Sequence, residues 1–204
     1  MSAHCCPAPE PAVDPRYRRV LWIALAINAA MFLVEIAAGL HAQSASLLAD
    51  ALDFFGDAAN YAVSLAVLGM LPVWRSRAAL LKGLSMGAFG VFVLAKAAGN
   101  ATTGVMPEPA IMGMVGFVAL LANVSVAVML YRYRAGDADM RSVWLCSRND
   151  AIGNIAVMLA ALGVVGAGSG RPDVLVAAIM GTLALVAATS VVRQAVGELK
   201  PAGA

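Results

Sequence analysis

One stretch long enough to cross a bilayer, residues 46–70, carries three aspartates, and this constrains the fold more than any other feature. In a helix, Asp50, Asp53 and Asp57 lie on one face, and Asn60 falls within the same sector of about 80°. A charge at the centre of a bilayer costs about 2.5–3.5 kcal/mol on insertion scales. Because the stretch contains no basic residue, its acids need a counter-charge from elsewhere, and we expect the source of that charge to indicate the function.

The rest of the sequence predicts an all-α integral membrane protein. Apolar residues make up 61% and charged residues 13% of the chain, whereas soluble proteins average about 45–50% and 25%. Six apolar runs have the length of about 20 residues that a transmembrane helix needs. They lie near 19–40, 46–70, 78–98, 110–130, 142–165 and 172–193. We therefore expect one six-helix transmembrane domain over 19–193, a flexible tail over 1–18 and a short tail over 194–204.

Basic residues are concentrated in alternate connections of this predicted topology. They are Arg16, Arg18 and Arg19 in the N-terminal tail, Arg75, Arg77 and Lys82 in the second connection, Arg132, Arg134 and Arg141 in the fourth, and Arg193 and Lys200 at the C-terminal end. The first and third connections contain no Lys or Arg, and the fifth contains only Arg171. Because cytoplasmic loops carry the excess of basic residues, we expect both termini to be cytoplasmic.

The first run is of helix length, so it predicts an anchor rather than a signal peptide, and we expect a multi-pass protein of a bacterial inner membrane.

A second polar stripe occurs in the fifth apolar run. Cys146, Asp150 and Asn154 are spaced four residues apart and span about 80° of one helix face. Arg148 points about 200° away from Cys146; it can extend to the membrane surface or pair with an acid across the bundle. The second and fifth helices run antiparallel in this topology, so the two stripes can meet at one depth.

Together the stripes predict a metal site with four ligands, Asp53, Asp57, Cys146 and Asp150. Zn²⁺ favours four ligands that include Cys, His and Asp, and a thiolate favours Zn²⁺ or Cd²⁺ over Mg²⁺ or Ca²⁺. Other roles stay open, because a lone Cys in an apolar helix is more often a core residue. Likewise, an Asn in a membrane helix more often forms an interhelical hydrogen bond.

Charge balance at this predicted site suggests a mechanism. Three carboxylates, with or without a thiolate, carry more negative charge than one divalent cation neutralises. Without metal, close carboxylates in a low dielectric should bind protons, and a binding metal should release them because its ligands must be deprotonated. A site that opens alternately to each side would then exchange metal for H⁺.

Other polar residues allow two interpretations each. Glu35 and Lys96 lie near the outer ends of the first and third helices, and a pair between them would remove both charges from lipid; we favour this structural role over transport. His4 stands beside Cys5 and Cys6. An odd number of cysteines argues against a disulfide framework, which leaves soft-metal contact or an ordinary tail.

The two polar helices together make the chain resemble the cation diffusion facilitators. The segments LLADALDFFGDAANY and LCSRNDAIGN carry the resemblance, which covers about residues 18–198. The family pattern is an (H/D)-x-x-x-D pair in helix 2 and another in helix 5; Asp53 and Asp57 match the first pair, and Cys146 and Asp150 match the second. The family's opening is also matched, by Asn28, Glu35, Gly39, Ser44 and Ser46. The resemblance implies a homodimeric antiporter of divalent metal and protons that exports Zn²⁺, Cd²⁺, Co²⁺, Fe²⁺ or Mn²⁺.

Two departures from the family pattern matter. Cys146 stands where zinc-transporting members usually have His or Asp, which shifts the expected preference toward soft metals. Family members commonly carry a cytoplasmic metal-binding domain after helix 6, and we expect this chain to lack it, so that the membrane helices form the dimer. Gly83 and Gly87 form a small-xxx-small pair that would permit such packing, and the His-Cys-Cys tail could capture metal near the cytoplasmic entrance.

Two enzyme classes also place acids in membrane helices, and neither fits. CDP-alcohol phosphotransferases need D-x-x-D-G-x-x-A-R, but Phe54 follows Asp53. Aspartyl intramembrane proteases need GxGD, and Gly56-Asp57 lacks the first glycine. We therefore expect no enzymatic activity, no cofactor besides the transported metal, and no nucleic-acid partner. The alternatives are a metal-binding membrane protein without transport, or a transporter of Co²⁺, Fe²⁺ or Mn²⁺.

Overall fold

The computed structural model describes residues 15–66, 72–133 and 138–199, apart from the side chains of 72–73, 75 and 138–149. Within these ranges the chain is all-helical, as predicted. The helices are α1 (Pro15–His41), α2 (Ala45–Ala66), α3 (Pro72–Thr103), α4 (Pro109–Tyr131), α5 (Ala138–Ala167) and α6 (Arg171–Leu199). Each contains one of the predicted apolar runs or most of it, and α3 begins six residues earlier than the run at 78–98.

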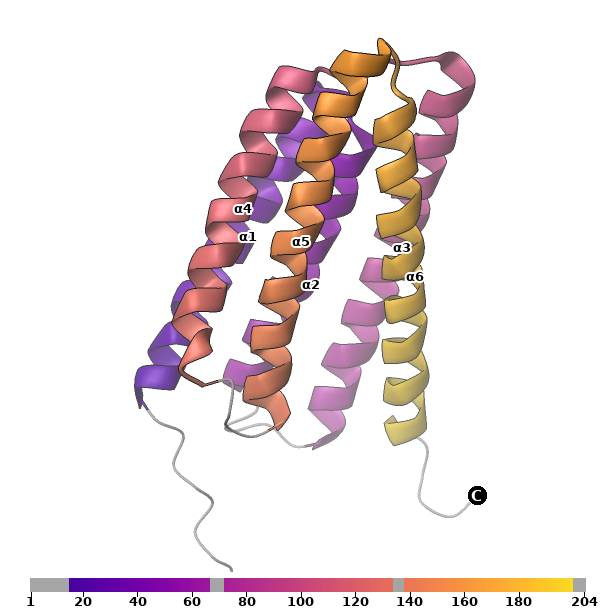
Figure 1. The fold of residues 1–204 in the computed structure, drawn as a ribbon. Coiled ribbons are helices and arrows are strands. Elements are labelled where there is room, and N and C mark those ends of the chain that lie inside the picture. The colour runs from indigo at the N-terminus through magenta and orange to yellow at the C-terminus, as the bar shows by residue number, and fades with distance from the viewer. Residues whose placement is uncertain (1–14, 67–71, 134–137, 200–204) are drawn as a thin grey trace, which may run out of the picture.

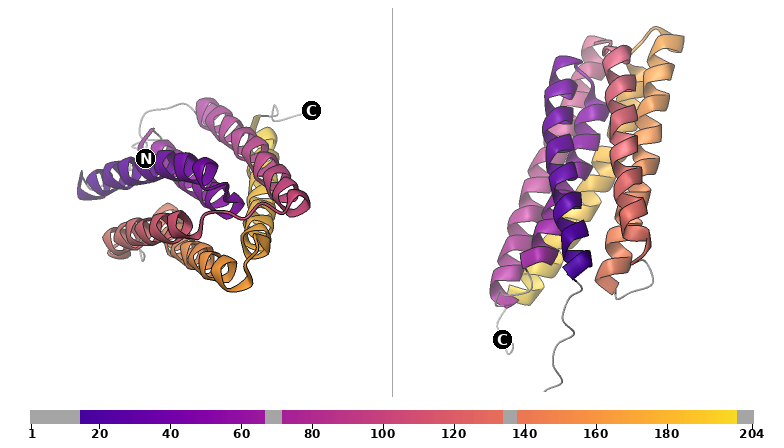
Figure 2. Two further views of the ribbon diagram at one scale, coloured as in Figure 1. Left: turned by 90° about the horizontal axis from the view of Figure 1, so that it is seen from above. Right: turned by 90° about the vertical axis from the view of Figure 1, so that its left-hand side faces the viewer.

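The six helices form one bundle in which neighbours along the chain run antiparallel (Figure 1). The start of α1 and the end of α6 lie at the same end of the bundle, which we call the terminal end. The short connections 42–44, 104–108 and 168–170 lie at the opposite end, the loop end. The most extensive contacts join α1 to α2, α3 to α6 and α4 to α5, and Figure 2 shows these pairs side by side from above and from the side.

Five of the helices are long and apolar enough to cross a membrane, counted over the described residues; these are α1, α3, α4, α5 and α6. Their outer faces carry large apolar side chains, such as Leu33, Leu81 and Leu162, that are at least two-thirds exposed. Such a surface suits lipid rather than water. The remaining helix, α2, carries the three aspartates and contacts α1, α3, α5 and α6. Its acids are therefore surrounded by protein instead of lipid.

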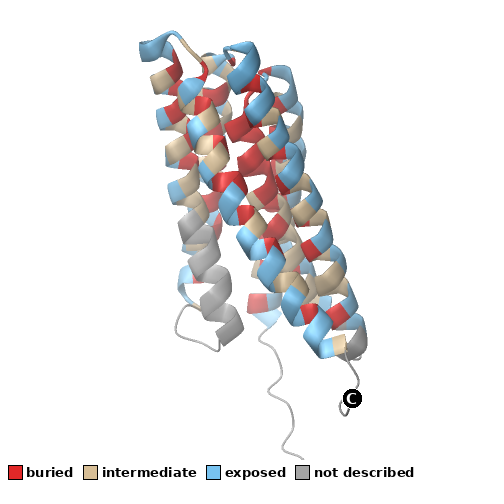
Figure 3. Cartoon of the chain, turned by 90° about the vertical axis from the view of Figure 1, so that its right-hand side faces the viewer, coloured by how far each residue is buried: buried red, intermediate tan, exposed pale blue. Residues whose placement is uncertain are grey.

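Packing around α2 is tight at the loop end and looser at the terminal end. Residues 45–52 are all buried, whereas no residue of 62–66 is. Figure 3 shows the same gradient, with buried residues concentrated toward the loop end of the bundle. The buried segment 45–52 thus separates Asp53 and Asp57 from the loop end of the bundle.

Glycines on α3 bring this helix against α6 of the same chain. A β-carbon at Gly83 would lie 2.8 Å from Cγ2 of Val192, and one at Gly90 would lie 3.0 Å from Cδ2 of Leu185. Gly87, between them, faces Ala188. The predicted use of Gly83 and Gly87 as a dimer face is therefore wrong for this chain, because α6 already occupies that face.

Candidate metal-binding site

A carboxylate from α6 fixes the first turn of α2 and thereby the depth of the α2 acids. Asp173 is fully buried. Its Oδ1 accepts hydrogen bonds from Ser44 Oγ (2.7 Å), Ser46 Oγ (2.6 Å) and the Ser46 backbone N–H (3.0 Å), and its Oδ2 accepts one from the Ala45 N–H (2.9 Å). Ser44 Oγ in turn accepts the N–H of Leu47 at 3.1 Å, as an N-cap side chain does. The sequence analysis missed Asp173; its only signal is an acid in the first turn of a helix, where carboxylates are favourable.

The predicted pairing of α2 with α5 is seen at Asp57 and Asp150, whose carboxyl groups lie against each other. Asp57 Oδ2 also accepts a hydrogen bond of 2.9 Å from the hydroxyl of Tyr61, one turn along α2. Tyr61 packs in an apolar cluster with Tyr17 and Leu130, so its hydroxyl is held in place. Asp53 is close enough to both carboxyls for its charge to interact with them. The structure therefore brings Asp53, Asp57 and Asp150 into one region of the bundle, as a cluster of carboxyl groups.

The structure does not assemble a complete metal-ligand set from the side chains that it describes. No three His, Cys, Asp or Glu side chains in the described part are arranged to hold a metal ion. The fourth predicted ligand, Cys146, lies outside the described side chains, as does Arg148. The set of Asp53, Asp57, Cys146 and Asp150 therefore stays a prediction.

Asp50 belongs to a hydrogen-bond chain that crosses three helices. Asn154 on α5 donates from Nδ2 to Asp50 Oδ2 at 2.6 Å, and Asn123 on α4 donates from Nδ2 to Asn154 Oδ1 at 3.0 Å. All three side chains are buried. Asn154 thus forms the interhelical hydrogen bond that is the common role of Asn in membrane helices. This chain ties α2 to α4 and α5 on the loop-end side of the Asp57–Asp150 pair.

Glu35 does not pair with Lys96, and the expected ion pair between them is wrong. Its carboxyl group lies against that of Asp50. Glu35 is fully buried, and no N–H or O–H group in the described part of the chain donates to either of its oxygens. Two buried carboxyl groups in contact require a shared proton or a cation, because like charges repel strongly in a low dielectric.

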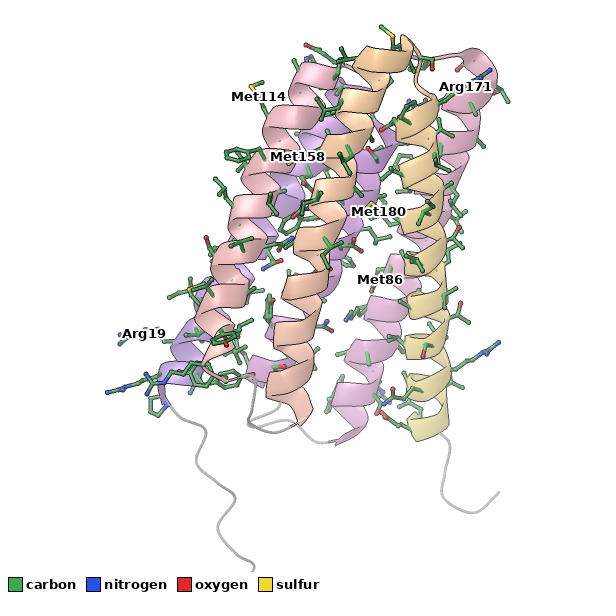
Figure 4. The ribbon with its side chains drawn as sticks, in the orientation of Figure 1. Arg19, Met86, Met114, Met158, Arg171 and Met180 are labelled. Carbon is green, nitrogen blue, oxygen red and sulfur yellow. The ribbon has the colours of Figure 1, made fainter. Side chains whose placement is uncertain are left out.

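A lysine near the terminal end of the cluster was not predicted as part of the site. Lys82 on α3 donates a hydrogen bond from Nζ to Asn60 Oδ1, one turn of α2 beyond Asp57. The sequence analysis used Lys82 only as a topology signal. Two methionines also extend into the bundle interior (Figure 4): Met86 packs beside Gly56, and Met180 packs beside Gly153.

Comparison with known proteins agrees with this architecture. Residues 73–199, more than half of the chain, match the family model described as the cation efflux transmembrane domain. The match includes α3 to α6 and thus Asp150, while Asp53 and Asp57 lie before it. A search of curated proteins found no match. The family match and the helical bundle with its buried acids place this chain in the cation efflux family of multi-pass membrane proteins, which transport metal cations.

Proposed function

We propose that this protein exports Zn²⁺ or Cd²⁺ from the cytoplasm in exchange for protons. The observation that carries the proposal is the meeting of Asp57 from α2 with Asp150 from α5, beside Asp53, inside a bundle of the cation efflux family. Adjacent ionised carboxylates inside a membrane bundle are costly without a bound cation, because each charge loses hydration and repels the others. A transported divalent cation would neutralise them, and protons would replace it once it leaves.

The path to the site is inferred from packing and charge. The loop end is closed around residues 45–52, whereas the terminal end of α2 is only partly covered. Arg19 lies at the terminal end (Figure 4), and basic residues mark the cytoplasmic side. We therefore infer that both termini face the cytoplasm and that the metal reaches the acids from there. The proposal includes a homodimer formed by membrane helices in a bacterial inner membrane.

Metal transport can be tested with purified protein reconstituted into liposomes. An imposed pH gradient should drive Zn²⁺ flux, and a pH-sensitive dye should report H⁺ moving in the opposite direction. Asp57→Asn and Asp150→Asn should each reduce the Zn²⁺ flux to the level of empty liposomes, since each removes one carboxylate from the cluster. Glu108→Gln is the matched control, because it removes an exposed carboxylate outside the cluster.

Three results would contradict parts of the proposal in different ways. Zn²⁺ flux without any dependence on the pH gradient would overturn the exchange with protons. Flux that persists in both aspartate variants would remove the proposed site. Tight Zn²⁺ binding without flux would indicate a metal-binding membrane protein that does not transport, and a host strain sensitive to Zn²⁺ or Cd²⁺ would then gain no tolerance from expression.

A further inference from the structure

Lys82 places a positive charge beside the proposed metal site. Its side chain is half-buried, and its Nζ donates a hydrogen bond to Asn60 Oδ1 on α2. Asn60 lies three residues after Asp57 and therefore on the same face of the helix, one turn nearer the terminal end. The Lys82 ammonium therefore lies about one helical turn from the Asp57 carboxyl.

The backbone around Lys82 limits its ability to turn away. Gly83, the next residue, packs against Val191 and Val192 of α6, where even a β-carbon would lie within 3.2 Å of a side chain. Successive residues of a helix point about 100° apart, so the contact of Gly83 with α6 sets the direction of position 82. The hydrogen bond that Lys82 Nζ donates to Asn60 Oδ1 then holds the ammonium group on the α2 side.

A fixed ammonium at this position affects any cation that reaches Asp57. A divalent ion beside Asp57 would be repelled by Lys82, because two positive charges would then share a partly buried, low-dielectric region. The ammonium also offsets part of the negative charge of an ionised Asp57, which the metal would otherwise neutralise. Both effects weaken metal binding relative to a site without the lysine.

We propose that Lys82 is a tethered counter-cation that competes with the transported divalent ion for Asp57 and so lowers the affinity of the site. This inference rests on the proposed metal transport. Its consequence for transport is faster release, because the ammonium repels the divalent ion bound beside it. Lys82 would thus limit how tightly the exporter holds its substrate.

Isothermal titration of the detergent-solubilised protein with Zn²⁺ at one fixed pH tests the competition. Lys82→Gln and Lys82→Met should each bind Zn²⁺ roughly tenfold more tightly or more, since a nearby positive charge is removed. Lys82→Arg should remain within about threefold of the wild type because its charge is kept. Lys96→Gln is the matched control: it removes a half-buried lysine of the same helix, about four turns further along α3.

Initial transport rates separate competition from damage to the fold. At saturating Zn²⁺, Lys82→Gln should transport more slowly than the wild type while its apparent KM falls, because release becomes slower. A Zn²⁺ affinity of Lys82→Gln and Lys82→Met equal to or weaker than that of the wild type would overturn the inference, provided that thermal unfolding shows both variants folded. If only one of the two variants folds, its Zn²⁺ affinity alone tests the inference. Failure of the wild type itself to bind or transport Zn²⁺ would instead refute the proposed function.

Discussion

At the scale of single residues, the buried polar groups include side chains that tie helices together and oxygen atoms that accept no hydrogen bond. Asp173 and Asn154 each connect helices through hydrogen bonds. The Glu35 oxygens and Asp50 Oδ1 have no hydrogen-bond partner in the described part of the chain. Unsatisfied buried oxygens are costly, and their position next to the Asp53–Asp57–Asp150 cluster is consistent with a region built to hold cations or protons.

The predicted sulfur ligand can be tested at this scale. Cys146→Ser should weaken Cd²⁺ binding more than Mn²⁺ binding in isothermal titration, because a thiolate favours soft metals while Mn²⁺ prefers oxygen. The control variant carries Cys5→Ser and Cys6→Ser and keeps Cys146. Equal loss of Cd²⁺ and Mn²⁺ affinity in Cys146→Ser would remove the soft-ligand argument. A loss of Cd²⁺ affinity in the control alone would indicate that Cys5 or Cys6, and not Cys146, binds the metal.

At the scale of the helices, α2 depends on α6 for its position. Four hydrogen bonds reach the Asp173 carboxylate from residues 44–46, before and within the first turn of α2. A helix start leaves several N–H groups unpaired, and here a residue 127–128 positions away in sequence accepts two of them. This contact sets how deep Asp53 and Asp57 lie relative to α5, so it connects local capping to the geometry of the site.

Substitution of Asp173 should therefore destabilise the whole bundle. Asp173→Ala leaves buried donors of Ser44, Ala45 and Ser46 without an acceptor, at about 1–3 kcal/mol for each unsatisfied group. The transition in thermal unfolding in detergent should fall well below that of the wild type. Asp173→Asn keeps one acceptor oxygen, so its unfolding transition should lie between those of the wild type and Asp173→Ala. An unchanged transition in Asp173→Ala, equal to that of Glu108→Gln, would show that the carboxylate does not hold α2.

At the scale of the whole molecule, the packing around α2 is tight at the loop end and looser at the terminal end. Contacts of α3 with α6 and of α4 with α5 are among the most extensive, while α2 lies between them and carries the acids. Exposed apolar side chains cover the outside of the bundle. Because Gly83 and Gly87 face α6, a dimer must use another surface.

Glycine substitutions on α3 distinguish packing within the chain from packing between chains. Gly83→Leu should lower the thermal unfolding transition and the yield of folded protein, because its side chain would overlap Val192. Gly99→Leu is the matched control on the same helix, since nothing lies within 4 Å of a β-carbon there. If Gly83→Leu stays as stable as Gly99→Leu but changes the oligomer measured by light scattering, Gly83 would be a dimer contact after all.

The sequence by itself determined the all-α class, the approximate helix positions and the faces on which the acids lie, because apolar run length and the 3.6-residue period are local properties. It also predicted the meeting of α2 and α5 at Asp57 and Asp150, since both stripes had to leave lipid. Only the tertiary structure decided that Glu35 contacts Asp50 instead of Lys96, that Asp173 caps α2, that Lys82 binds Asn60 and that the α3 glycines face α6. These contacts depend on the rotation and relative depth of each helix. Those are set by packing between residues far apart in sequence, which periodicity along one helix leaves open.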